Sequence, residues 1–114
     1  MSPTVTFDAG DVVVVPFPFT DRATSRRRPA LVVSNRPFND HHAQVVLAMI
    51  TSATNPGWPS DTPIGDRDGA GLNADSIIRL KFFTLDQSLV QRRIGGLGKN
   101  DLKAMREAMK RWLF

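Results

Sequence analysis

Apolar residues occur along the chain in short runs that are separated by polar segments containing Gly, Pro and Asp. Runs of this length that are rich in Val, Ile and Phe predict β-strands. We expect strands at residues 12–19, 29–34, 44–51 and 76–83, and shorter ones at 61–64 and 93–94. The intervening segments are expected to be loops at 20–28 and 52–63 and turns at 35–42 and 66–75.

The end of the chain has a different periodicity. From about Asp101, apolar residues recur every three or four positions, which predicts an amphipathic helix. We expect Trp112, on the apolar face of this helix, to lie in the core. Thr84 and Gln87 have the spacing of a capping box, which predicts that a short helix starts there. The apolar face of the terminal helix consists of Leu102, Met105, Met109 and Trp112.

Two prolines shape the first expected strand. Pro16 and Pro18 lack backbone N–H groups, and at alternate positions they leave these gaps on the same side of the strand. That side cannot pair fully, which predicts either a sheet edge or the end of the strand. Several short strands followed by one helix predict a mainly β fold, in which a bent antiparallel sheet or small barrel is completed by a C-terminal helix.

Length and charge narrow the class of protein. The 114 residues predict a single domain over 1–114. Lys and Arg number 15 against 11 Asp and Glu, which gives a net charge of +4. This balance favours an anionic partner, of which nucleic acid is the commonest. From charge alone, a solvated basic loop without a partner is an equal alternative.

The composition also excludes several classes of protein. The chain has no cysteine, which excludes disulfides and thiolate metal sites. No apolar run approaches the ~18 residues of a membrane span, and the first residues have neither the basic start nor the apolar core of a signal peptide. We therefore expect a cytoplasmic protein with no membrane association, no cofactor and no metal site.

The most basic segment leads into the second expected strand. Between residues 20 and 37, five arginines are opposed by one acid, Asp21. Pro29 restricts the preceding Arg28 to extended backbone, so this guanidinium is presented at the start of a strand in a defined direction. Guanidinium groups match phosphate oxygens bidentately. The alternative interpretation is an ordinary surface arginine.

Two other positions could contact a ligand. Thr51 and Ser52 come where the third expected strand ends, and a hydroxyl there can bind a ligand or cap a turn. Trp58 lies in a loop rich in Pro and Gly, where an exposed indole could stack on a base. The alternative for Trp58 is that it covers the core from outside.

The order of motifs resembles the MazF/PemK family of toxins over nearly the whole chain. The similar segments are Gly10-Asp11-Val12, RPALVVSN at 28–35, VVLAMITS at 45–52, Asp75-Ser76-Ile77-Ile78 and Thr84-Leu85-Asp86, followed by the terminal helix. The resemblance implies an SH3-like barrel with an added helix. It also implies a homodimer that cleaves single-stranded RNA and is inhibited by a cognate acidic antitoxin.

The resemblance also assigns site residues. The catalytic arginine of the family falls on Arg28, and its catalytic hydroxyl falls on Thr51. Many members carry Gln-x-Arg where this chain has Lys81-Phe82-Phe83, so the sequence at which RNA is cut cannot be transferred. We expect RNA to contact Arg26, Arg27, Ser52, Trp58 and Lys81.

Two alternatives remain open at this stage. The related CcdB-type toxins share the architecture but act by binding DNA gyrase, without nuclease activity. A noncatalytic RNA-binding barrel could have kept the basic loop. The segment at 28–35 and the Thr51 hydroxyl favour the nuclease.

Overall fold

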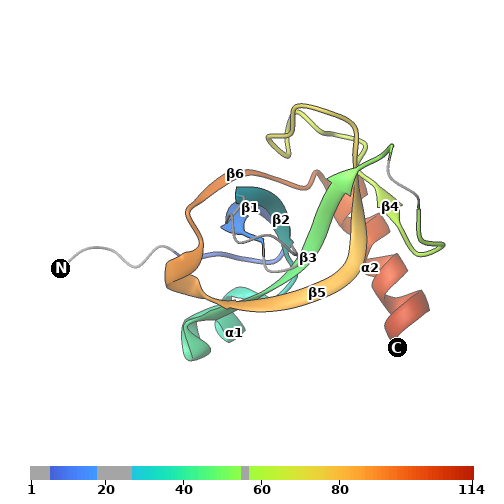
Figure 1. The fold of residues 1–114 in the computed structure, drawn as a ribbon. Helices are drawn as coiled ribbons and strands as arrows, with labels where there is room; N and C mark the ends of the chain where they lie inside the picture. Colours follow the sequence, from blue (N-terminus) through green and yellow to red (C-terminus); the bar gives the residue numbers. More distant parts are fainter. Residues whose placement is uncertain (1–5, 18–26, 55–56) are drawn as a thin grey trace.

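A computed structural model describes residues 6–17, 27–54 and 57–114. These residues form one antiparallel sheet in the order β4-β5-β3-β2-β1-β6, which curls strongly, with helix α2 along one side (Figure 1). The strands are β1 (Asp11–Pro16), β2 (Arg27–Val32), β3 (Gln44–Ser52), β4 (Thr62–Pro63), β5 (Ser76–Asp86) and β6 (Arg92–Gly96). The helices are α1 (Arg36–His42), the 3₁₀ turn η1 (Gln87–Leu89) and α2 (Lys99–Leu113).

Alternating side chains divide the apolar residues between the two faces of the sheet. In β1, Val13 and Val15 belong to one cluster, whereas Val12 belongs to the other. The first cluster consists of the buried residues Phe7, Val13, Val15, Phe17, Ala30, Val32, Val45, Leu47 and Phe83. The helix-side cluster consists of Val12, Leu31, Ala48, Ile50, Ile64, Ala70, Leu72, Ile78 and Met105. The expected mainly β fold, a small barrel with a terminal helix, is confirmed.

The strands agree with the apolar runs that predicted them, apart from their ends. β5 continues to Asp86, three residues past its expected end, because it pairs with the whole of β3 around an irregularity at Ala48 and Met49. The short helix does not start at Thr84, which lies in β5 opposite Val46. Instead the Asp86 carboxylate caps η1 by accepting the Ser88 N–H at 2.9 Å.

β1 is an interior strand, between β2 and β6, so the interpretation of the prolines as a sheet edge is wrong. The alternative, a strand end, is correct, because β1 ends at Pro16. The pairing with β6 extends only to Val14, so no N–H is required from Pro16 on that side. Pro18 lies outside the described residues.

Helix α1 replaces the expected turn at 35–42. Asn35 caps it by accepting the Phe38 N–H at 3.1 Å, and Pro37 is tolerated in the first turn, where N–H groups have no helical partner. The fully buried Asn39 anchors the helix, because its amide donates to the carbonyls of Phe7 at 2.9 Å and Ser34 at 3.1 Å. The helix has no apolar stripe, so periodicity could not reveal it.

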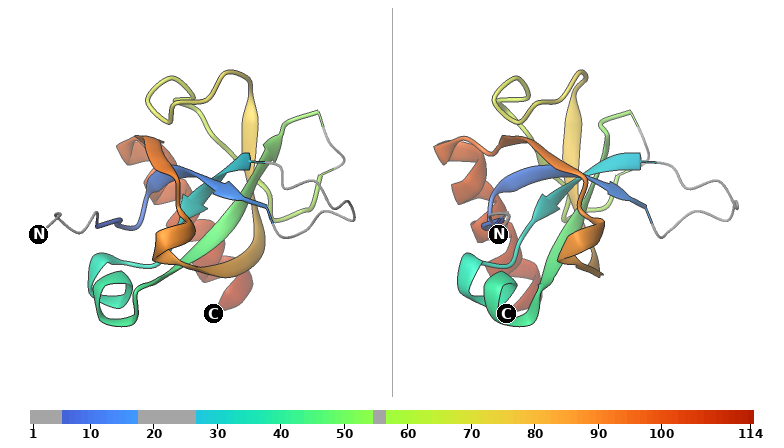
Figure 2. Two further views of the ribbon diagram at one scale, coloured as in Figure 1. Left: turned by 60° about the vertical axis from the view of Figure 1, so that its left-hand side comes forward. Right: turned by 90° about the vertical axis from the view of Figure 1, so that its left-hand side faces the viewer.

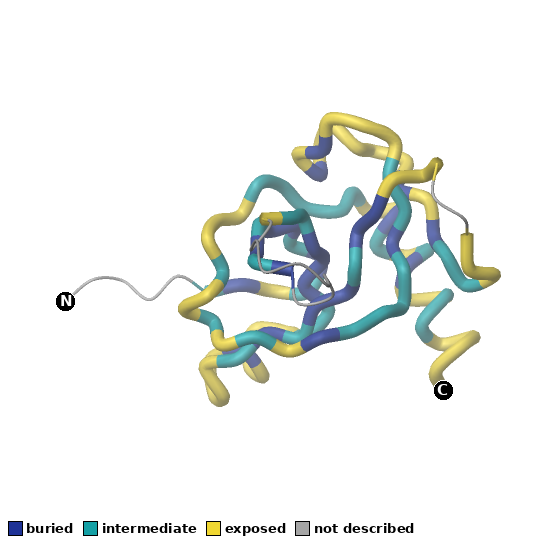
Figure 3. Tube along the Cα trace, in the orientation of Figure 1, coloured by how far each residue is buried: buried dark blue, intermediate teal, exposed yellow. Residues whose placement is uncertain are grey.

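The expectation for Trp112 is wrong. Met105 is buried against the sheet, but the Trp112 side chain near the end of α2 is 48% exposed. The last turns of α2 extend past the part of the sheet that the helix covers. Figure 3 shows that this C-terminal end is exposed. The helical spacing therefore identified the apolar face correctly but not how far along the helix it is covered.

Candidate active site

The antiparallel pairing of β2 with β3 brings the start of one strand beside the end of the other. In this register Ala30 lies opposite Met49. Two residues further along, the same register places Arg28 opposite Thr51. Figure 2 shows the start of β2 and the end of β3 together, on the side of the molecule away from the N-terminus. The expectation that these strands are antiparallel neighbours is confirmed.

Both side chains also lie on the same face of the sheet. Arg28 shares its face with Ala30, and Thr51 shares its face with Leu47, because every second side chain points the same way. Ala30 and Leu47 are both in the first cluster. Ser52, one residue further, belongs to the opposite face of the strand.

A pocket of about 200 Å³ opens where these two strand ends meet. The Thr51 side chain is buried at its wall, with 7% exposure. The pocket also contains an acid that sequence reasoning gave no role, Asp75, whose carboxylate accepts from Arg67 Nη1 at 3.1 Å. The polar residues that line it are Arg28, Thr51, Ser52, Asp75 and Ser76.

The guanidinium of Arg28 is held without an ion pair to any described residue. Its central carbon lies 5.6 Å from the ring centroid of Phe17, a cation–π contact that orients the group without neutralising it. Its Nε is buried and has no hydrogen-bond partner among the described residues. A buried donor in this state costs about 1–3 kcal/mol.

A second arginine on this face has the opposite environment. Arg79 lies opposite Met49, and its Nε and Nη2 donate to the two carboxylate oxygens of Asp61 at 3.1 and 2.9 Å. Burial raises the pKa of the Asp61 carboxyl, but the hydrogen bonds from Arg79 and from the Trp58 N–H, with the arginine's charge, bring that pKa below its ordinary value. This ion pair neutralises Arg79, so Arg28 and Arg79 are not interchangeable.

The remaining predicted contacts are only partly brought to the pocket. Ser52 lines it, but its hydroxyl is already bonded to the Thr54 hydroxyl at 2.8 Å. Arg27 is exposed at the start of β2, and Lys81 is a half-buried residue of β5 that does not line the pocket. Trp58 is 43% exposed. Arg26 lies outside the described residues.

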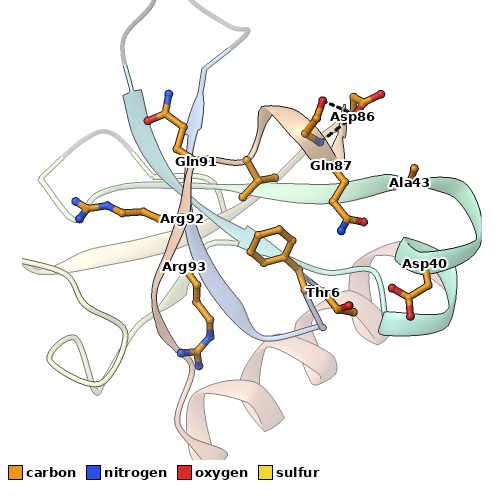
Figure 4. A pocket seen from close by; sticks show the side chains of 11 residues that line it. Thr6, Asp40, Ala43, Asp86, Gln87, Gln91, Arg92 and Arg93 are labelled. Atoms are coloured by element: carbon orange, nitrogen blue, oxygen red, sulfur yellow. Dashed lines mark hydrogen bonds between the residues drawn. The ribbon is translucent and has the colours of Figure 1, made fainter. Parts of the chain in front are cut away.

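A larger pocket lies elsewhere on the described surface and contains none of the predicted site residues. It has a volume of about 940 Å³ and opens between α1, η1 and β6. Figure 4 shows Asp40 on one side of it and Gln87 and Thr6 nearer its centre. Pocket size alone would therefore have selected residues other than Arg28 and Thr51.

Two structural features bear on metal and membrane sites. Among the described residues, no three His, Asp or Glu side chains are grouped so that they could hold a metal ion. Neither α1 nor α2, nor any other described helix, has the length and apolar character of a membrane span.

Comparison with known proteins identifies the family. The family model of PemK-like, MazF-like toxins of type II toxin-antitoxin systems matches residues 8–113. This chain belongs to the PemK/MazF toxin family. The resemblance of its motifs is thereby confirmed. No curated protein sequence gives a significant match.

Solved structures of toxins share the fold. A MazE-MazF structure from Deinococcus radiodurans is 23% identical, with a TM-score of 0.74 over 96% of this chain and 97% of that chain. An endoribonuclease in complex with its cognate antitoxin, from Mycobacterial species, is 18% identical, with a TM-score of 0.73 over 95% and 93%. The Mycobacterium tuberculosis toxin MazF-mt6 is 22% identical, with a TM-score of 0.70 over 89% and 93%.

The contrast between the two arginines makes a prediction about stability. Arg28→Met keeps an unbranched side chain against Phe17 and removes the unpartnered Nε, so the free energy of unfolding should stay within about 1 kcal/mol or rise. Arg79→Met leaves the Asp61 carboxylate without its cation and should lower that free energy by about 3 kcal/mol. Urea denaturation of both variants gives the comparison. Equal destabilisation would mean that Arg28 is a structural residue.

Proposed function

We propose that this chain is an endoribonuclease toxin that cuts single-stranded RNA without a metal ion and leaves a 2′,3′-cyclic phosphate and a 5′-OH. The observation that supports this most directly is a pocket lined by both Arg28, which forms no ion pair with any described residue, and the buried Thr51. A guanidinium can bind two phosphate oxygens at once, and a hydroxyl beside it can orient the same phosphate.

The proposed reaction uses the substrate's own nucleophile. The 2′-oxygen loses its proton and attacks the neighbouring phosphorus, the bond from phosphorus to the 5′-oxygen breaks, and the leaving 5′-oxygen takes a proton from solvent water. Negative charge grows on the phosphoryl oxygens during attack, and Arg28 stabilises it. Because a guanidinium stays protonated in proteins, Arg28 is a poor proton acceptor. DNA lacks the 2′-OH and would not be cut.

The 2′-OH proton needs an acceptor, and we assign this role to Asp75. Its carboxylate belongs to the same pocket as Arg28 and is the acidic side chain among the described lining residues. The side chain is 86% exposed, so substrate can reach it, and its carboxylate is paired with Arg67 at 3.1 Å. An Asp carboxylate is one of the side chains that can act as a general base.

The comparisons support the toxin function and give no support to the gyrase-binding alternative. The matched structures include a protein described as an endoribonuclease and others described as MazE-MazF. Since these chains are under 25% identical to this one, they support the proposal through the fold that they share with it. The cleavage assay described next distinguishes a noncatalytic RNA-binding barrel from a nuclease.

We predict that Arg28→Ala lowers the single-turnover rate by a factor on the order of 10²–10³, since it removes a charged donor to the transition state. Asp75→Asn should cost a factor on the order of 10²–10⁴, and Thr51→Ala somewhat less than Arg28→Ala, because a neutral hydroxyl forms a weaker hydrogen bond. The rates are measured on a long, mixed-sequence single-stranded RNA in EDTA. Arg27→Ala, on the same strand, should mainly weaken binding and flatten its salt dependence.

Three results would contradict this assignment. Loss of wild-type cleavage in EDTA, with recovery in magnesium, would show that the reaction needs a metal. Near-normal rates for Arg28→Ala and Asp75→Asn would remove the proposed active site. RNA binding without cleavage by the wild-type protein would favour the noncatalytic barrel. The exposed Asp68→Asn, in the neighbouring turn, is the control for Asp75→Asn.

We also propose that the chain acts as a homodimer. One pocket of about 200 Å³ holds little more than a single phosphate and ribose, and two pockets joined by an isologous contact would form a longer groove for an RNA strand. Static light scattering at micromolar concentration should give the mass of two chains. A monomer under these conditions would contradict the proposal.

The partner that we propose is an acidic, partly disordered antitoxin segment that covers the pocket at Arg28. A carboxylate can take the place of the RNA phosphate on Arg28, so antitoxin and RNA should compete. Binding should weaken as salt rises, although apolar anchors limit the loss. Cleavage measured at increasing antitoxin concentration tests this. An antitoxin that binds α2 alone and leaves cleavage intact would contradict it.

A further inference from the structure

Trp58 is a large exposed aromatic residue that contributes to neither apolar cluster. Its side chain is 43% exposed, and it is absent from the residues that form or pack against either cluster in the described part of the chain. The interpretation that it covers the core from outside is therefore not supported. An indole in this position buries little apolar surface. Contacts with neighbouring residues nevertheless hold it in place.

Its backbone is fixed by Asp61. The Trp58 N–H donates to the Asp61 carboxylate at 2.7 Å, and the Asp61 N–H donates back to the Trp58 carbonyl at 3.0 Å. Pro59 further restricts Trp58 to extended conformations. These contacts close the turn from Trp58 to Asp61 into a rigid unit.

Its ring is fixed by Arg79. The central guanidinium carbon lies 5.1 Å from the centroid of the indole. The guanidinium is itself fixed by two hydrogen bonds to Asp61, and both charged side chains are about nine-tenths buried, at 11% and 10% exposure. A cation–π contact with a partly desolvated guanidinium is stronger than one in water. The same carboxylate therefore holds both the backbone of Trp58 and the cation under its ring.

This unit lies beside the proposed active site. Ile77 pairs with Thr51 across β3 and β5, and Arg79, two residues further, projects from the same face. Diagonal neighbours of this kind are separated by about 7–8 Å. One short oligonucleotide can therefore reach both Thr51 and the indole.

We infer that Asp61 and Arg79 are positioning residues that hold Trp58 as a stacking platform for an RNA base next to the phosphate that is cut. This inference rests on the proposed function and deepens it. Stacking on an aromatic ring reads the flat face of a base and tolerates different sequences. The platform thus selects unpaired bases, since a base within a duplex is already stacked on both sides.

The test uses the fluorescence of Trp58. The chain has two tryptophans, and Trp112→Phe leaves Trp58 as the single reporter. The probes are a short 2′-O-methyl oligoadenylate, which has no free 2′-OH and cannot be cut by the proposed reaction, and an abasic oligomer of the same length and charge. Oligoadenylate should quench the fluorescence and bind more tightly than the abasic oligomer, by a factor on the order of 10.

Variants separate positioning from folding. Asp61→Asn and Arg79→Met should weaken binding of oligoadenylate several-fold and reduce the quenching, while binding of the abasic oligomer stays the same. A role confined to fold stability would weaken both probes together. Arg93→Met removes an arginine from another Asp–Arg pair, which has no tryptophan over it, and should leave the ratio of the two affinities unchanged. Circular dichroism confirms that each variant is folded.

The outcomes distinguish the two proposals. If both probes bind equally and the fluorescence does not change, RNA binding stands and the platform is wrong. If oligoadenylate quenches the fluorescence equally in all variants, Trp58 stacks on bases but Asp61 and Arg79 do not position it, which overturns the inference. If neither probe binds, the inference fails together with the proposed RNA substrate.

Discussion

The register of β3 is the constraint on which the rest of this structure depends. β3 pairs with β2 on one side and with β5 along its whole length on the other. Since side chains alternate between faces, a slip of one residue would exchange the first cluster with the helix-side cluster and turn Thr51 away from Arg28. The apolar side chains of β3, Val45 and Leu47 on one face and Ala48 and Ile50 on the other, make such a slip costly. Burial of apolar side chains therefore fixes the geometry of the pocket.

The parts of the fold that the sequence predicted are those that apolar burial determines. Each long apolar run became a strand, and the spacing from Leu102 to Met109 identified the buried side of α2. The errors arise where hydrogen bonds or limited coverage decide the outcome. Helix α1 is held by the Asn35 cap and the buried amide of Asn39, and neither has a periodic signal. Trp112 is exposed because a helix can be longer than the surface it covers.

The same distinction applies to the site. Arg28 and Thr51 could be predicted as site residues because each lies at the end of a recognisable strand and the family resemblance names both. The ion pair of Asp61 with Arg79 joins residues 18 apart in sequence and could not be inferred without the pairing of β4 with β5. Asp75 lies in a segment that the resemblance included, but no residue type or spacing there indicated chemistry. These roles depend on which residues lie close together in the folded chain, and a single sequence does not show this directly.

The two arginines on this face differ in whether a described acid neutralises their charge. Arg79 has a buried acid as its partner, so its charge is already satisfied and holds a loop in place. Arg28 has an aromatic ring on one side and a buried donor with no partner among the described residues. The second arrangement leaves a buried donor unsatisfied, which costs free energy. On the proposed function, RNA phosphate and antitoxin carboxylate compete for the same guanidinium, whose charge no described acid neutralises. Inhibition then needs no conformational change, because the feature that makes the pocket able to stabilise a phosphate also makes it open to an acidic competitor.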